Sequence, residues 1–259
     1  MEPSATPSPP RARVASDQAL KLVAQVNIAL GQGNVAEART CAHTARLLYR
    51  KRTTPFPPKD AALVMLANGR SLHARALLLQ QTSERDAEVQ LSIKQSPGLL
   101  RQTSSRLRQA MTLLNDSSSS NILLIAQVQS MQGLVQYDIS QQGAQSLKDG
   151  RIKRLRRKKR AKLRQQGLDK MRAAVEQLRA HPQPATSRQS LEVYLNLVSC
   201  CGVLERGRYI VEAIEQCDDL GISRKYALAH LLGRRAITKS LAKFYAAHTP
   251  VPAPKETTP

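Results

Sequence analysis

Aromatic residues are scarce in this chain. Of its 259 residues, two are Phe, six are Tyr and none is Trp, so aromatics make up 3% of the composition. An all-β sandwich ordinarily packs its core with more aromatic and β-branched side chains than this. Because 41% of the residues are still apolar, the chain has enough hydrophobic material for a buried core. The composition therefore predicts an all-α protein and excludes disorder along its full length.

Long hydrophobic runs are also missing. The purely apolar stretch Ala61–Ala67 is far shorter than the roughly 20 residues that a membrane-spanning helix needs. The N-terminal stretch MEPSATPSPPRARV has no apolar core and carries an acidic residue, so it does not resemble a secretory signal. We expect a nuclear or cytoplasmic protein. A mitochondrial location is less favoured, because Arg11 and Arg13 alone point to it.

Signatures of catalysis and metal binding are absent. The four cysteines form no CxxC pair, and three of them lie in apolar helical patterns, where a thiol packs as a small hydrophobe. The stretch GQGN at Gly31–Asn34 lacks both the third glycine of a dinucleotide fold and the Lys-Ser/Thr ending of a phosphate loop. No GxSxG or HExxH motif occurs. We therefore predict a protein that is not an enzyme and that needs no cofactor or metal.

Apolar residues recur at intervals of three and four between two proline-rich ends. We expect residues 1–15 and 248–259 to be disordered and residues 16–247 to form one helical domain, with insertions at 82–98 and 142–162. Breaks at proline, glycine and serine clusters, such as Ser96–Gly98, divide this domain into helices and leave no convincing strand. The predicted helices are 18–30, 35–50, 60–81, 99–114, 121–141, 163–180, 188–204, 206–220 and 224–246.

The helix order predicts stacked α-hairpins. A hairpin repeat needs small side chains where its second helix crosses its first. Three predicted second helices share a spacing of four and then three residues: Ala38, Ala42 and Ala45; Thr103, Leu107 and Ala110; and Gly167, Met171 and Ala174. The repeated spacing favours an α-hairpin repeat solenoid, although any amphipathic helix can supply the same interval.

One segment resembles the tetratricopeptide family. The stretch Leu22–Leu48 has an apolar helix, a turn glycine at Gly33, the pair Glu37 and Ala38, and then Ala42 and Ala45. It departs from that family on the first helix, where Val26 and Ala29 replace the usual glycine and large aromatic residue. The resemblance implies a tetratricopeptide-like solenoid whose concave face binds a protein or peptide partner.

A second segment resembles a pentatricopeptide repeat. Within Tyr194–Ser223, the order of Tyr194, Leu197 and Val198 and the later pair Gly221 and Ile222 fit that pattern. Ile210 and Val211 stand where the family usually has alanine, and no second copy follows in register. This resemblance implies RNA binding as an alternative, although no residue role carries over from one copy.

Charge is strongly one-sided, because 40 Lys and Arg against 19 Asp and Glu give a net charge of +21. One block carries ten of these cations and no acidic residue: Arg151, Lys153, Arg154, Arg156, Arg157, Lys158, Lys159, Arg160, Lys162 and Arg164. A second group, Arg235, Lys239 and Lys243, recurs every four residues on one face of the predicted closing helix. Such clusters contact phosphates, form nuclear-import signals or lie solvated on a surface.

Two functions remain open. The first is a helical-repeat scaffold that binds a protein segment in its groove, with the basic block serving nuclear targeting or anionic contacts. Polar residues on the predicted first helices are the candidates for that groove: Asn27, Asn68, Arg75, Gln127 and Asn196. The second is an RNA-binding subunit of a ribonucleoprotein, which would grip RNA or another polyanion through its basic segments. Peripheral membrane binding is less favoured, because the basic block has too few apolar residues.

Overall fold

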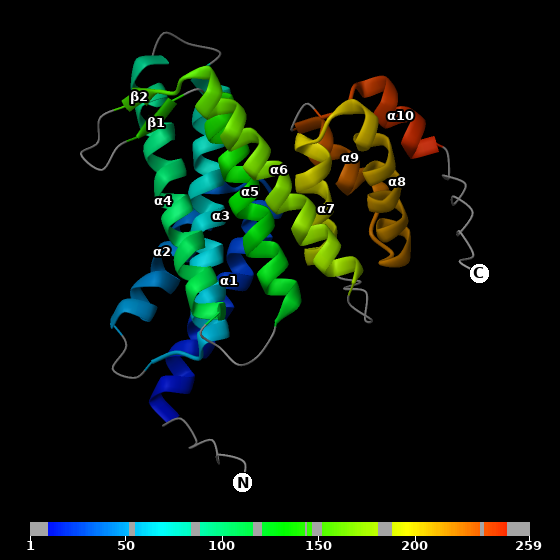
Figure 1. Cartoon of the computed structure of the whole chain (residues 1–259). Helices are drawn as coiled ribbons and strands as arrows, with labels where there is room; N and C mark the ends of the chain where they lie inside the picture. The colour runs from blue at the N-terminus through cyan, green and yellow to red at the C-terminus, as the bar shows by residue number, and fades with distance from the viewer. Residues whose placement is uncertain are drawn as a thin grey trace.

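The structure is a computed structural model that describes residues 10–51, 55–83, 89–115, 121–142, 144–146, 152–180, 188–233 and 236–247. These residues form helices and one short hairpin (Figure 1). The helices are α1 Pro10–Gly31, α2 Val35–Lys51, α3 Pro58–Ser83, α4 Val89–Asn115, α5 Ile122–Gln142, α6 Arg157–Arg179, α7 Arg188–Cys200, α8 Val203–Asp219, α9 Arg224–Gly233 and α10 Lys239–Ala247. The predicted all-α class is confirmed.

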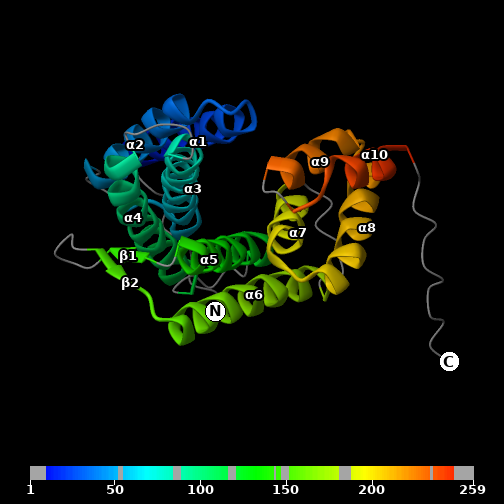
Figure 2. The same ribbon diagram turned by 90° about the horizontal axis from the view of Figure 1, so that it is seen from above.

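Consecutive helices pack as adjacent pairs, α1 with α2 through to α9 with α10. Viewed from above, the pairs follow an arc, with α3, α5 and α7 on its inner side and α4, α6 and α8 on its outer side (Figure 2). The second helix of each of the first three pairs packs through the small residues that the spacing predicts. For example, Ala38, Ala110 and Ala174 are fully buried.

Helices α5 and α6 cross very closely at two glycines. A Cβ placed on Gly133 would lie 2.5 Å from the carbonyl oxygen of Gly167, and one on Gly167 would lie 2.6 Å from that of Gly133. The two glycines therefore let the helix backbones touch. This contact fixes α6 along the outer side of α5.

The turn at Gly33 has a local cause. Gly33 adopts a φ of 75°, which favours glycine, and the Asn34 N–H donates to the carbonyl of Ala29 at 2.8 Å. Asn34 then starts α2, because its Oδ1 accepts from the backbone N–H of Glu37 and its Nδ2 donates to the carboxylate of Glu37. Gly221 ends α8 in the same left-handed conformation, as its position predicts.

Two predicted boundaries are wrong. Helix α1 begins at Pro10, so residues 10–15 are helical where disorder is expected. Helix α4 begins at Val89 and continues through Pro97, so the expected insertion 82–98 is largely helical. Buried contacts offset the backbone hydrogen bond that proline removes. The hydroxyl of Ser96 donates to the carbonyl of Ala76 and accepts from Gln142.

The other predicted insertion, 142–162, is also structured in part. Strands β1 Ala144–Ser146 and β2 Ile152–Arg154 pair antiparallel, and neither is evident from the apolar pattern. Leu155 follows and is buried in the core. The predicted closing helix 224–246 is wrong as one element, because α9 ends at Gly233 and α10 begins at Lys239. Between them Ala236 and Ile237 are buried, which anchors the break.

Candidate binding groove and basic surfaces

A groove of about 370 Å³ opens on the inner side of the arc. Every residue that lines it comes from an odd-numbered helix: α1, α3, α5, α7 or α9. The lining residues are Asn27, Leu30, Gly31, Leu66, Arg70, His73, Ala74, Leu77, Gln127, Met131, Leu134, Glu192, Val193, Asn196, Tyr226, Ala229 and His230. The first helices of all five pairs thus contribute to one concave site.

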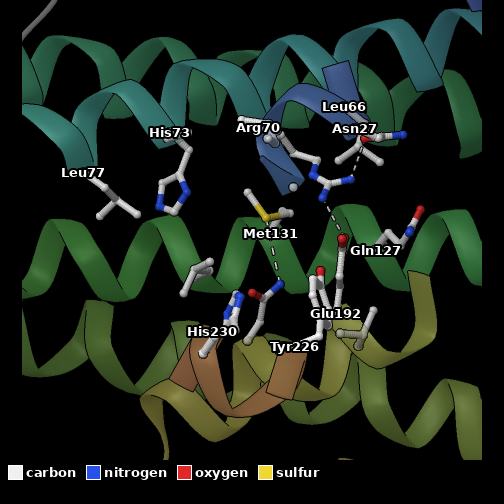
Figure 3. Close-up of a pocket in the computed structure, with 17 residues that line it drawn as sticks. Asn27, Leu66, Arg70, His73, Leu77, Gln127, Met131, Glu192, Tyr226 and His230 are labelled. Atoms are coloured by element: carbon white, nitrogen blue, oxygen red, sulfur yellow. Dashed lines mark hydrogen bonds and ion pairs between the residues drawn. The ribbon is translucent and has the colours of Figure 1, made fainter. Parts of the chain in front are cut away.

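Arg70 lies at the centre of this site (Figure 3). Its guanidinium donates to Oδ1 of Asn27 at 3.0 Å and forms an ion pair with Glu192 at 2.7 Å. The side chains of Arg70 and Glu192 are 18% and 24% exposed, so the pair is partly shielded from water. Arg70 therefore ties α1, α3 and α7 together across the groove.

Buried polar contacts join α3 and α7 to α5 beside the groove. Nε2 of His73 lies 2.7 Å from Oδ2 of Asp138, which joins α3 to α5. The amide of Asn196 donates to the hydroxyl of Ser130 at 3.1 Å and approaches the sulfur of Met131 at 3.9 Å, which joins α7 to α5. Side-chain contacts thus link α1, α3, α5 and α7 around the groove.

The lining combines apolar and polar surface. Leu66, Met131, Leu134 and Val193 provide the apolar part, while Gln127 and Asn27 lie on the same side of the site (Figure 3). This mixture suits a ligand with apolar side chains and a hydrogen-bonding backbone.

Three of the five predicted groove residues lie in this groove: Asn27, Gln127 and Asn196. Asn68 and Arg75 do not line it. Asn68 is 5% exposed and its Oδ1 has no hydrogen-bond partner among the described residues, while Arg75 is half-buried. Sequence reasoning missed Arg70, which lies one and a half turns from Arg75 on α3. Only the fold brings Arg70 to Asn27 and Glu192, so no local pattern could identify it.

The basic block lies at the hairpin and the start of α6. Arg151 and the side chain of Lys153 fall outside the described residues. Arg154 and Arg156 are exposed, as are the cations of the first turns of α6: Arg157, Lys158, Lys159, Arg160, Lys162 and Arg164. From Arg157 onward, the block is part of helix α6.

Two of these α6 cations contact residues of α5. Nε of Arg160 donates to the carbonyl of Ser140 at 2.9 Å, and the guanidinium of Arg164 lies 5.5 Å from the centre of the Tyr137 ring. The second basic group is described only in part. Lys239 and Lys243 are exposed on α10, whereas Arg235 falls outside the described residues.

The described thiols are all free, and Cys200, Cys201 and Cys217 are buried. Burial raises the pKa of Cys201, and it raises the pKa of Cys217 to about 11, with the carboxylate of Asp218 adding to the increase. These thiols therefore stay protonated near neutral pH. Across the described ranges, no group of three or more His, Cys, Asp or Glu side chains is arranged to hold a metal ion.

In comparisons with known proteins, no protein-family model and no curated protein matches this chain. Among the described helices, none has the length and apolar character needed to cross a membrane.

Proposed function

We propose that this protein is a tetratricopeptide-like helical-repeat adaptor that binds an extended segment of a partner protein in its groove. The observation that supports the proposal most strongly is the origin of the lining. All of it comes from α1, α3, α5, α7 and α9, the first helices of the five pairs. Stacked hairpins place their first helices on the concave side, where solenoid proteins bind ligands.

The chemistry of the groove supports a peptide ligand. An extended peptide has unpaired backbone N–H and C=O groups, which side-chain amides can satisfy as donors and acceptors. Asn27 and Gln127 present such amides, and Met131 and Val193 offer apolar contacts beside them. An acidic side chain of the peptide would compete with Glu192 for Arg70.

The start of α6 supports a further anionic contact. Cations near a helix N-terminus are unfavourable, because the helix dipole is positive there. Arg157, Lys158 and Lys162 nevertheless lie exposed in the first turns of α6, and they form no ion pair with a carboxylate in the part of the chain that the structure describes. An acidic surface, such as that of an import receptor, would stabilise them.

Selection from a random-peptide display library on the full-length protein tests the groove. We expect enrichment of a shared motif that combines apolar residues with at least one acidic residue. The selected peptide should bind the Ala229→Trp variant at least tenfold more weakly, because Ala229 lines the groove and is exposed. A tenfold change corresponds to about 1.4 kcal/mol.

The matched control is Ala246→Trp. Ala246 is an exposed alanine on α10 and does not line the groove. Binding to this variant should stay within twofold of the unmodified protein. Failure to enrich any motif, or equal weakening by both variants, would overturn the proposal.

A further inference from the structure

The outer side of the molecule carries a second charged surface that the sequence patterns do not reveal. Arg46 and Arg50 lie one turn apart on α2, Arg106 and Arg108 lie on α4, and Lys170 lies on α6. We name these five residues the cationic band. None of them forms an ion pair with a carboxylate among the described residues. The band lies on even-numbered helices, whereas the groove is lined by odd-numbered ones.

The five cations form two neighbouring sets, Arg46 with Arg50 and Arg106, and Arg108 with Lys170. Burial and the charge of Arg50 lower the pKa of Arg46, and burial with both of these arginines as neighbours lowers the pKa of Arg106. Burial and the charge of Arg108 lower the pKa of Lys170. Positive charge is thus concentrated across three helices without compensation, and an anionic partner would relieve the repulsion.

The side-chain types indicate the kind of anion. Four of the five cations are arginines, whose planar guanidinium donates two parallel hydrogen bonds to a phosphate. On the C-terminal side of Arg108, the exposed ridge of α4 carries the amide of Gln109 and the hydroxyl of Thr112. Arg106 itself donates to Oε1 of Gln109 at 2.9 Å. This ridge can hydrogen-bond to ribose hydroxyls and base edges.

A pocket of about 520 Å³ lies beside the band. Tyr49 from α2 lines it, together with Ser105, Arg108, Gln109 and Thr112 from α4. An aromatic ring next to amide and hydroxyl groups suits an unstacked base. A membrane surface fits less well, because Leu47 is the one large apolar side chain of α2 that is exposed.

We propose that the cationic band binds the sugar–phosphate backbone of single-stranded RNA, and that the pocket beside Tyr49 takes a base. The site is separate from the groove and from the basic start of α6. Its contacts are mainly to the backbone, so its preference for sequence is weak. The proposal does not depend on peptide binding in the groove.

Fluorescence anisotropy with a labelled 20-nucleotide oligo(U) RNA tests this proposal at 50 and 150 mM salt. The test variant replaces Arg46, Arg50 and Arg106 with Gln. We expect affinity to fall about tenfold or more, and the slope of log K against log salt to become shallower by about 2, because three phosphate contacts are lost. The same variant should keep the helical circular dichroism of the unmodified protein.

Two variants with the same loss of charge serve as controls. One replaces Lys225, Lys239 and Lys243 with Gln on α9 and α10, and the other replaces Arg157, Lys158 and Lys162 with Gln at the start of α6. Both should bind RNA within threefold of the unmodified protein. Equal weakening by all three variants would show an effect of net charge alone and would overturn the proposal, as would a loss confined to the α6 variant.

Two further measurements define the ligand and the role of arginine. Replacing Arg46, Arg50 and Arg106 with Lys keeps the charge but removes the planar fork, so affinity should fall severalfold while the salt slope is kept. Oligo(dT) of equal length should bind more weakly than oligo(U). No binding of RNA at 50 mM salt, or tighter binding to oligo(dT), to poly-glutamate or to phosphatidylserine vesicles, would contradict the assignment.

Discussion

At the crossing of α5 and α6, two glycines leave no room for a side chain. A Cβ on Gly167 would meet a backbone carbonyl at 2.6 Å, and backbone cannot move aside as a flexible side chain can. We expect Gly167→Ala to lower the free energy of unfolding by about 1–3 kcal/mol, measured by urea denaturation.

The control for this change is Gly207→Ala on α8, where an added Cβ meets no atom within 4 Å. Because alanine favours a helix over glycine, this variant should be neutral or more stable by up to about 1 kcal/mol. A loss at Gly207 as large as that at Gly167 would contradict the close crossing.

The buried thiol of Cys217 makes stability depend on alkaline pH. Its pKa is raised to about 11 in the folded protein, compared with about 8.5 in an unfolded chain. The folded state favours the neutral thiol, so this contribution is complete below pH 8.5 and is lost as the pH rises toward 11. Between pH 8 and pH 10.5, the unmodified protein should lose more stability than Cys217→Ala. Parallel losses in urea denaturation would show that this thiol does not contribute.

Between elements, Arg70 is the contact that joins α1, α3 and α7. Removing it leaves the partly buried carboxylate of Glu192 without its cation, which we expect to cost about 1–3 kcal/mol. A double-mutant cycle of Arg70→Ala and Glu192→Ala measures the coupling between these helices.

The matched pair is Asp169 and Arg172, three residues apart on α6, where Asp169 is 57% exposed. Its coupling energy should be about 0.5 kcal/mol or less, because exposed ion pairs are screened by water. If the Arg70–Glu192 coupling were no larger than this value, Arg70 would not be an anchor of the groove.

The sequence predicts the helices well where local signals agree. Gly33 and Gly221 mark the turn after α1 and the end of α8, and both adopt the left-handed backbone conformation there. Prediction failed where distant contacts decide the outcome. Pro97 does not break α4, because Ser96 is tied to α3 and α5 from outside its own helix.

The sequence predicts part of the groove but not the cationic band. Polar residues on the first helices could be selected by periodicity, and Asn27, Gln127 and Asn196 do line the groove. The cationic band could not be predicted, because its members are scattered over 125 positions of sequence from Arg46 to Lys170 and come near one another only when the successive helix pairs stack. The sequence shows a basic surface only where cations are adjacent in the chain, as at residues 151–164.

For the whole molecule, pairing of helices separates two surfaces. The inner helices form a groove of mixed polarity. The outer helices α2, α4 and α6 (Figure 2) carry the cationic band. Protein and RNA would therefore bind without competing for the same residues. We expect oligo(U) affinity to change by less than threefold when the groove is filled by Ala229→Trp, measured by anisotropy.

Photo-crosslinking is the most direct test of the groove. A peptide selected on the protein, carrying a benzophenone side chain, would be irradiated in its complex and the labelled residues mapped by mass spectrometry. We predict crosslinks to α3, α5 and α7 around Arg70, Met131 and Val193, which line the groove. Crosslinks confined to the even-numbered helices would contradict the account of this protein as a groove-binding adaptor.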